Sequence, residues 1–254
     1  MDAPKTVFTE QDVGIETADG VADAALAQPA QAGPWPAIIM YPDGFGLRPT
    51  KVEMAKRLAS EGYVVLVVNP FYRIGRAPVL PADFNRSDPA DRARLMKMIE
   101  DLDHETVTRD ARAFETFLSA QPQVSKSAKM GAVGFCMGGS MTVRAAAALP
   151  HRLGAAVSLH GGRLVTEGPD SPHRLVAHTN AAFHIGVAAD DDEKEPNVKV
   201  IMKAALEAAE LPHTLAVYAG TRHGWTVPDS PAYDKAQAAA AWTVMSSTFR
   251  SALI

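Results

Sequence analysis

The sequence predicts an α/β fold in which helices cover both faces of a mostly parallel central sheet. Short, uniformly apolar runs recur along the chain, such as "VVLVV" at 64–68. Runs of this kind are typical of central parallel strands that are buried on both faces. Stretches with helical spacing of apolar residues follow most of these runs. Regular alternation of strands and helices indicates a parallel sheet wrapped on both sides.

The first third of the chain begins with a predicted β-hairpin. Alternating residues at 13–17 and 21–27 flank "ADG", which is a turn signal. The run "AIIMY" predicts a strand at 37–41, and helical spacing in "TKVEMAKRLASEGY" predicts a helix that ends at Gly62. Residues 69–90 follow the strand at 64–68 and are rich in proline, so we expect a long surface connection that serves as a lid or binding loop.

The rest of the chain continues the alternation. We expect helices near 90–102, 104–120, 138–149, 193–210 and 231–253, and strands near 129–135, 153–160, 181–189 and 213–220. The last helix is amphipathic, with Trp242, Met245 and Phe249 on one face. The sequence contains no repeat, and no change of composition marks a second domain, so we expect one domain over 1–254.

Composition argues against several classes of protein. Hydrophobic residues make up 47% of the 254 residues and charged residues 21%, which is typical of a globular domain. The net charge of −4 gives no reason to expect nucleic acid or an anionic membrane as partner. The N-terminus lacks the pattern of a signal peptide, and no Cys/His cluster has zinc spacing. We therefore expect a cytoplasmic protein, a monomer or small homo-oligomer, with neither metal nor cofactor.

The only cysteine of the chain, Cys136, lies in "GFCMGGS" between a predicted strand and a predicted helix. A nucleophile on a sharp strand-to-helix turn needs small neighbours two positions away on either side, and Gly134 and Gly138 occupy those positions. The free N–H groups and the positive dipole end of the helix favour a thiolate there. The alternative, a buried cysteine that acts as a small hydrophobic residue, does not account for this pattern.

A nucleophile of this type needs a base and an acid from later strand ends. His223 lies in a glycine-rich turn after the last predicted strand, and we expect one of its ring nitrogens near Cys136 and the other near an acid. The run "ADDDEKEP" offers Asp190, Asp191 and Asp192 as that acid, and we favour Asp191 by its spacing from the strand. His184 is expected in the core; His160 is expected at the pocket without a catalytic role.

These residues resemble the dienelactone hydrolase (carboxymethylenebutenolidase) family of the α/β-hydrolase superfamily. The matching stretches are "MYPDGFGLRP", "GFCMGGS", "GVAADD", "YAGTRHGW" and "YDKAQAAAAW", and they span almost the whole chain in the family's order. The resemblance implies an α/β-hydrolase fold and a cofactor-free hydrolase of a small ester or lactone. It also implies Cys136 as nucleophile, Asp191 as acid and His223 as base, with a thioester intermediate.

Further roles follow from the resemblance alone. The backbone N–H groups of Gly44 and Met137 would form the oxyanion hole, and Asp43 would contact the resting thiol. The family holds its substrate carboxylate with two arginines. Arg92, or alternatively Arg94, matches the first, whereas Val227 stands where the second would lie. Since valine cannot replace an arginine of such a clamp, we expect a more apolar pocket that uses Phe45, Phe71, Tyr72 and Trp225.

Two other functions compete with the hydrolase. A thiol redox protein would need only the reactive cysteine, but the chain has no second cysteine to resolve an oxidised thiol. A non-catalytic binding module on the same fold would not need the nucleophile, acid and base together. Ester turnover that alkylation abolishes would distinguish the hydrolase from both.

Overall fold

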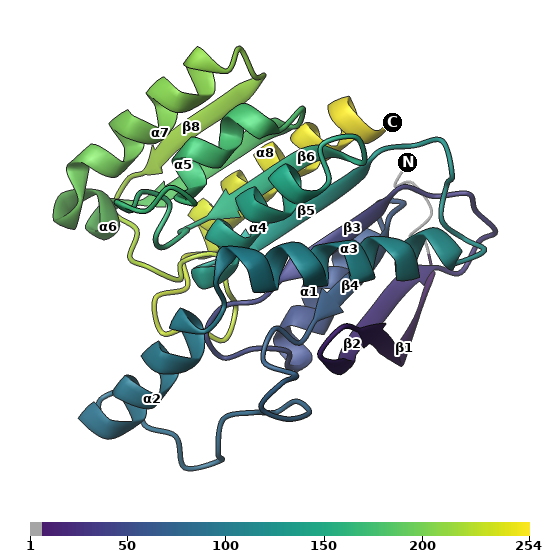
Figure 1. The fold of residues 1–254 in the computed structure, drawn as a ribbon, viewed down its shortest axis with the longest axis horizontal. Helices are drawn as coiled ribbons and strands as arrows, with labels where there is room; N and C mark the ends of the chain where they lie inside the picture. The colour runs from purple at the N-terminus through teal and green to yellow at the C-terminus, as the bar shows by residue number, and fades with distance from the viewer. Residues whose placement is uncertain (1–6) are drawn as a thin grey trace.

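The computed structural model describes residues 7–254 and has the predicted α/β architecture (Figure 1). Eight strands form one sheet in the order β1-β2-β4-β3-β5-β6-β7-β8. The pairs β1–β2 and β2–β4 are antiparallel, and all other neighbouring strands are parallel. The N-terminal hairpin therefore forms one edge of a sheet that is otherwise parallel.

The strands agree closely with the apolar runs of the sequence. Their bounds are β1 Phe8–Thr17, β2 Gly20–Pro29, β3 Ala37–Tyr41, β4 Val64–Val68, β5 Met130–Phe135, β6 Leu153–Leu159, β7 Ala182–Ala188 and β8 His213–Tyr218. Every residue of β3, β4 and β5 is buried, as expected for central strands covered on both faces. The hairpin strands are longer than predicted, because cross-strand pairing extends the hairpin beyond the alternating residues.

Most of the helices form two layers, one on each face of the sheet, and one helix extends away from the sheet (Figure 1). Their bounds are α1 Pro49–Ala59, α2 Pro89–Glu100, α3 His104–Ala120, α4 Met137–Ala148, α5 Pro172–Leu175, α6 Ala189–Lys194, α7 Pro196–Ala208 and α8 Lys235–Leu253. Helices α1 and α8 pack in one apolar cluster, and α3, α4 and α7 pack in a second cluster on the opposite face. Helix α2 extends away from the sheet in Figure 1.

One helix prediction was wrong. The sequence favours a single helix over 193–210, but α6 ends at Lys194 and α7 begins at Pro196. The backbone of Glu195 leaves the helical region with φ −133° and ψ 64°. The reason is local, since the residue before a proline is disfavoured in the helical conformation.

The parallel strands place the candidate residues at one edge of the sheet. Asp43, Cys136, His160 and Asp190 each lie just beyond the carboxyl end of a different strand. His223 follows β8 at the same edge, and α2 lies between the loop over 69–88 and α3. In open α/β sheets, ligand sites form at this carboxyl edge.

Candidate active site

Cys136 lies on a sharp turn between β5 and α4. Its backbone has φ 55° and ψ −118°, in a region that residues with a side chain avoid, so the surrounding structure must hold the strain. A Cβ atom at Gly134 would lie 1.8 Å from the carbonyl oxygen of Gly138. A Cβ atom at Gly138 would lie 2.4 Å from the carbonyl oxygen of Tyr41. The turn therefore requires both glycines.

His223 and Asp191 meet at the carboxyl edge of β7 and β8. Nδ1 of His223 lies 2.6 Å from Oδ2 of Asp191, which belongs to the first turn of α6. The neighbouring Asp190 accepts the backbone N–H of His223 through Oδ1 at 2.8 Å. One acid therefore orients the imidazole ring, and the acid beside it fixes the loop that carries the ring.

The environment of His223 favours the imidazolium. Burial opposes the charge, but the hydrogen bond to Asp191 and the nearby Cys136 outweigh burial and raise the pKa of His223 to about 10. The ring contacts the carboxylate through Nδ1, and it lines the same cavity as the thiol. This arrangement suits a nucleophile, base and acid.

The third acid of the run has a different partner. Oδ2 of Asp192 lies 2.6 Å from Nζ of Lys199, which belongs to α7. This ion pair links α6 to α7 across the break at Glu195. Within residues 7–254, Asp191 is the one of these three aspartates whose side chain forms a hydrogen bond with the ring of His223.

His160 contacts both the backbone of Cys136 and the ring of His223, a role that the sequence did not suggest. It is 1% exposed, and its Nδ1 accepts the backbone N–H of Cys136 at 3.1 Å. Because Nδ1 accepts, Nε2 carries the proton and donates it to Oγ1 of Thr226 at 2.9 Å. Burial and the nearby charges of His223 and Lys51 hold the pKa of His160 well below its usual value, so the ring is neutral.

A continuous column of rings lies under the candidate base. The ring centroids of Tyr218 and Trp225 are 5.0 Å apart, those of Trp225 and His160 are 5.2 Å apart, and those of His160 and His223 are 5.0 Å apart. Trp225 and His160 are buried. The imidazole of His223 therefore rests edge-on against a packed aromatic stack.

Gly44 and Met137 each line a cavity together with Cys136. Met137 is the first residue of α4, where a backbone N–H has no partner within the helix. Gly44 belongs to a turn in which Gly46 N–H donates to the carbonyl oxygen of Asp43 at 2.8 Å. This placement suits the pair of N–H donors that the sequence analysis assigned to an oxyanion.

The contacts of Asp43 differ from those expected of a residue that contacts the thiol. Its carboxylate lies 2.7 Å from Nη1 of Arg48 and 3.0 Å from Nζ of the fully buried Lys51. Burial opposes the charge of Asp43, but the two cations outweigh burial and hold its pKa below the ordinary range. Arg48 also pairs with Asp229 at 2.8 Å. In the part of the chain described, no hydrogen bond joins Asp43 to Cys136. The carboxylate of Asp43 is bound by Arg48 and Lys51 and not by the thiol.

A cavity of about 500 Å³ opens onto Cys136 and His223, and we call it the His223 cavity. Its lining comprises Asp43, Gly44, Phe45, Arg48, Arg86, Arg92, Leu95, Met96, Ile99, Cys136, His160, His223, Gly224, Val227, Asp229, Ser230 and Pro231. Phe45, Arg92 and Val227 lie where the sequence analysis placed them. Arg86 was missed, because its place in the irregular loop before α2 gives no sequence signal.

Three residues expected to contact substrate do not line this cavity. Phe71 packs in a separate apolar cluster with Met98 and Met137. The hydroxyl of Tyr72 donates to the carboxylate of Asp110, a buried residue of α3, at 2.9 Å. Trp225 is 0% exposed and lies beneath His160 in the aromatic column. The prediction was wrong for all three because aromatic side chains near a site are also used to build its floor.

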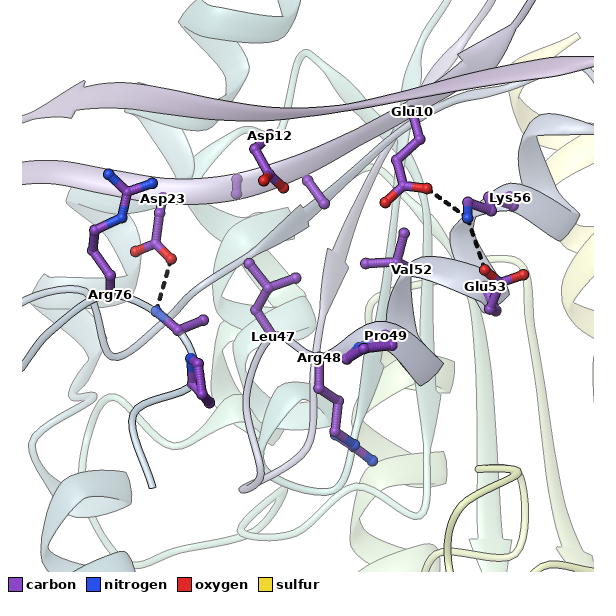
Figure 2. Close-up of a pocket in the computed structure, with 14 residues that line it drawn as sticks. Glu10, Asp12, Asp23, Leu47, Arg48, Pro49, Val52, Glu53, Lys56 and Arg76 are labelled. Carbon is purple, nitrogen blue, oxygen red and sulfur yellow. Dashed lines mark hydrogen bonds and ion pairs between the residues drawn. The ribbon is translucent and has the colours of Figure 1, made fainter. Parts of the chain in front are cut away.

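A second hollow of about 590 Å³, shown in Figure 2, lies beside the N-terminal hairpin and away from the catalytic candidates. Several of its charged side chains pair with their neighbours. Lys56 lies 2.5 Å from Glu10 and 2.7 Å from Glu53, and Asp23 accepts the backbone N–H of Ala77 at 2.9 Å. These pairs join β1 and β2 to α1 and to the loop after β4. The contacts indicate a structural role for this surface.

Within residues 7–254, no group of three or more His, Cys, Asp or Glu side chains is arranged to hold a metal ion. No helix in the same span has the length and apolarity that crossing a membrane requires.

Comparison with known proteins gives one consistent result. The model of the dienelactone hydrolase family matches residues 22–253. A Methylorubrum extorquens protein named "Putative carboxymethylenebutenolidase" is 27% identical over 244 residues, which cover 94% of this chain and 80% of that protein. A carboxymethylenebutenolidase of Pseudomonas sp. (strain P51) is 31% identical over 124 residues, which cover 49% of each chain.

The fold has a matching solved structure. The dienelactone hydrolase from Anabaena variabilis is 20% identical and superposes with a TM-score of 0.67, covering 97% of this chain and 99% of that one. At this identity the likeness concerns the fold.

Proposed function

The chain belongs to the dienelactone hydrolase family, and from this premise we propose that it hydrolyses a small ester or lactone with Cys136 as nucleophile. The observation that carries the proposal is the placement of three side chains at the carboxyl edge of the sheet: His223 is hydrogen-bonded to Asp191, and His223 and Cys136 line the same cavity. Two independent features support it. The turn at Cys136 is strained and requires both flanking glycines, and a cavity opens onto the thiol and the imidazole together.

The first half of the proposed reaction forms a thioester. The thiolate of Cys136 attacks the carbonyl carbon, and the negative charge that develops on the carbonyl oxygen is held by the N–H groups of Met137 and Gly44. His223, as imidazolium, gives its proton to the leaving oxygen when the carbon–oxygen bond breaks. Asp191 holds the ring in the orientation that this transfer needs. The products are an alcohol, or the opened end of a lactone, and an acyl group on Cys136.

The second half restores the enzyme. His223, now neutral, takes a proton from a water molecule, and the resulting hydroxide attacks the thioester carbonyl. The carbon–sulfur bond breaks, which releases the carboxylic acid and returns the thiolate and the imidazolium. The sequence of steps uses neither a metal nor an oxidant.

This function is tested by combining ester turnover with alkylation. We expect the purified protein to hydrolyse p-nitrophenyl acetate and to lose this activity when one equivalent of iodoacetamide has reacted with Cys136. Mass spectrometry of a peptide digest would identify the alkylated residue. Peroxide consumption without ester turnover would favour a thiol redox protein instead, and the absence of both activities would favour a binding module.

Val227 leads to a prediction about charge selectivity. This residue lines the His223 cavity where a second arginine of the family's carboxylate clamp would stand. A hydrogen bond to a charged group contributes about 1.5–3 kcal/mol, so its loss should weaken the preference for a carboxylated dienelactone by roughly one to two powers of ten. We expect a neutral lactone or short-chain ester to be hydrolysed with kcat/KM at least comparable to that of the carboxylated dienelactone.

The measurement is kcat/KM for both substrates on the wild type and on Val227→Arg. The variant should shift the ratio toward the carboxylated substrate, although the inserted guanidinium must find space where a 1% exposed valine now packs. A wild-type preference above about a hundredfold for the carboxylated lactone would contradict the prediction, because one clamp arginine would then suffice.

A further inference from the structure

Cys136 faces a second cavity on the other side of the turn. This cavity has a volume of about 420 Å³, and its lining includes Asp103, Cys136, Met137, Ser140, Arg144 and Asp170. We call it the Arg144 cavity. It shares Met96, Ile99 and Cys136 with the His223 cavity, but His223 does not line it. Two chambers therefore meet at the thiol.

The division of the two chambers orients a substrate. In the proposed reaction, the leaving oxygen must lie near His223, which gives it a proton. The carbonyl oxygen lies between Gly44, which lines the His223 cavity, and Met137, which lines the Arg144 cavity. The remaining substituent of the carbonyl carbon is the acyl chain. Because the leaving group occupies the His223 cavity, the acyl chain extends into the Arg144 cavity.

Arg144 is the buried charge of this chamber. Its side chain is 11% exposed, and two of its donor atoms, Nε and Nη1, are buried without an acceptor among residues 7–254. The nearest carboxylate belongs to Asp170, whose Oδ2 lies 3.8 Å from Nη1, beyond hydrogen-bond distance. A guanidinium with buried, unpaired donors is costly unless an acceptor is supplied. Burial correspondingly lowers the pKa of Arg144.

The acidic residues around this cavity are engaged elsewhere or exposed. Asp103 caps α3 by accepting the backbone N–H of Thr106 at 2.8 Å. The side chain of Asp170 is 46% exposed, and Glu100 and the cationic Arg163 are also exposed. An anion inside the cavity would therefore meet the buried donors of Arg144 before it met a buried carboxylate.

Arg144 is also aligned with the nucleophile. Ser140 and Arg144 lie one turn apart on the same side of α4, Cys136 immediately precedes this helix, and all three residues line the cavity. Eight residues of helix span about 12 Å. The arginine side chain leans back toward the N-terminus of its helix, which shortens that span.

We propose that Arg144 binds a carboxylate at the end of the substrate's acyl chain, so that the preferred substrates are monoesters of dicarboxylic acids. This inference rests on the proposed function and names its substrate class. A chain of about four methylene groups, which places the carboxylate roughly 6 Å from the scissile carbonyl, matches the spacing. The site is distinct from Arg92 and Val227, which lie in the chamber assigned to the leaving group.

The test compares two esters that differ only in charge, p-nitrophenyl adipate and its methyl ester. We expect wild-type kcat/KM to favour the charged ester by about tenfold or more. Arg144→Met should lower the ratio of charged to neutral kcat/KM by about the same factor. Arg112→Met, which removes an exposed arginine from α3, is the matched control and should leave this ratio unchanged. Thermal unfolding would verify that both variants fold.

The outcomes separate this inference from the proposed function. Turnover of both esters without a charge preference, or a preference that survives in Arg144→Met, overturns the inference and leaves the hydrolase intact. Failure to hydrolyse either ester overturns the proposed function. In that case, a binding measurement tests whether Arg144 forms a carboxylate site. Calorimetry with monomethyl adipate would be done on Cys136→Ala and on the same protein with Arg144→Met added. Binding that requires Arg144 supports the subsite, and equal or absent binding overturns it.

Discussion

Replacement of Cys136 by alanine is expected to lower kcat for p-nitrophenyl acetate by several powers of ten while leaving the fold intact. The covalent step has no other nucleophile, and loss of a nucleophile of this type costs about six powers of ten in a well-studied serine protease. Alanine suits the turn, because the strain there concerns the backbone and the flanking glycines remain. Steady-state kinetics and thermal unfolding of the two proteins make the comparison.

The variant Cys136→Ser tests whether a hydroxyl can replace the thiol as nucleophile. It puts an oxygen nucleophile of similar size at the turn, but a hydroxyl, unlike a thiol, is not ionised near neutral pH and needs a strong base in a site suited to a thiolate. We therefore expect little residual activity. Full activity in Cys136→Ala, with wild-type stability, would end the proposal that Cys136 is the nucleophile.

Replacement of Asp191 by asparagine is expected to reduce kcat by about three to four powers of ten, as for the orienting acid of other triads. In the proposed mechanism, Asp191 is a positioning residue that acts through His223. Without its charge, the imidazolium loses the partner that lies 2.6 Å from Nδ1. The pKa of His223 should then fall from about 10. Kinetics would measure the loss, and an NMR titration of the imidazole would measure the change in pKa.

Asp192→Asn provides the matched control for Asp191→Asn. It removes the same charge one residue away, where the carboxylate pairs with Lys199 and not with the imidazole. We expect kcat to stay within about threefold and the pKa of His223 to stay raised, since a partly exposed ion pair that does not touch the ring has a small effect on it. Equal losses of activity in the two variants would mean that the acidic run acts through its total charge, against an orienting role for Asp191.

Local sequence patterns predicted the parts of the site that depend on short segments. The turn at Cys136 is set by residues within two positions of it, so the glycine pattern was enough to locate it. Strand ends were equally readable, because central parallel strands are short apolar runs with clear limits. Asp191 and His223 could therefore be paired from the sequence alone, although they lie 32 residues apart.

Features that depend on packing between distant segments were not predictable in this way. His160 contacts Cys136, Thr226 and His223, which are brought to it by two distant segments, the turn after β5 and the loop after β8. Its sequence neighbourhood reads only as the end of a strand. The wrong assignments of Phe71, Tyr72 and Trp225 have the same origin, since an aromatic residue near a site can face either the cavity or the layer beneath it.

The ion pairs around Asp43 also escaped prediction. Arg48 joins Asp43, which follows β3, to Asp229, which follows β8, across 181 residues of sequence. A single sequence gives no sign of such a long-range pairing. The consequence is that the turn bearing Gly44 is tied to the loop bearing Val227.

The column formed by Tyr218, Trp225 and His160 has a consequence for how the free energy of binding is used. A side chain that must be ordered when substrate arrives loses conformational entropy at that moment, and this loss weakens binding or slows the reaction. The imidazole of His223 is confined by the column below it and by Asp191 at its edge. Its orientation is therefore fixed during folding, at the expense of protein stability, and substrate binding need not supply that entropy again.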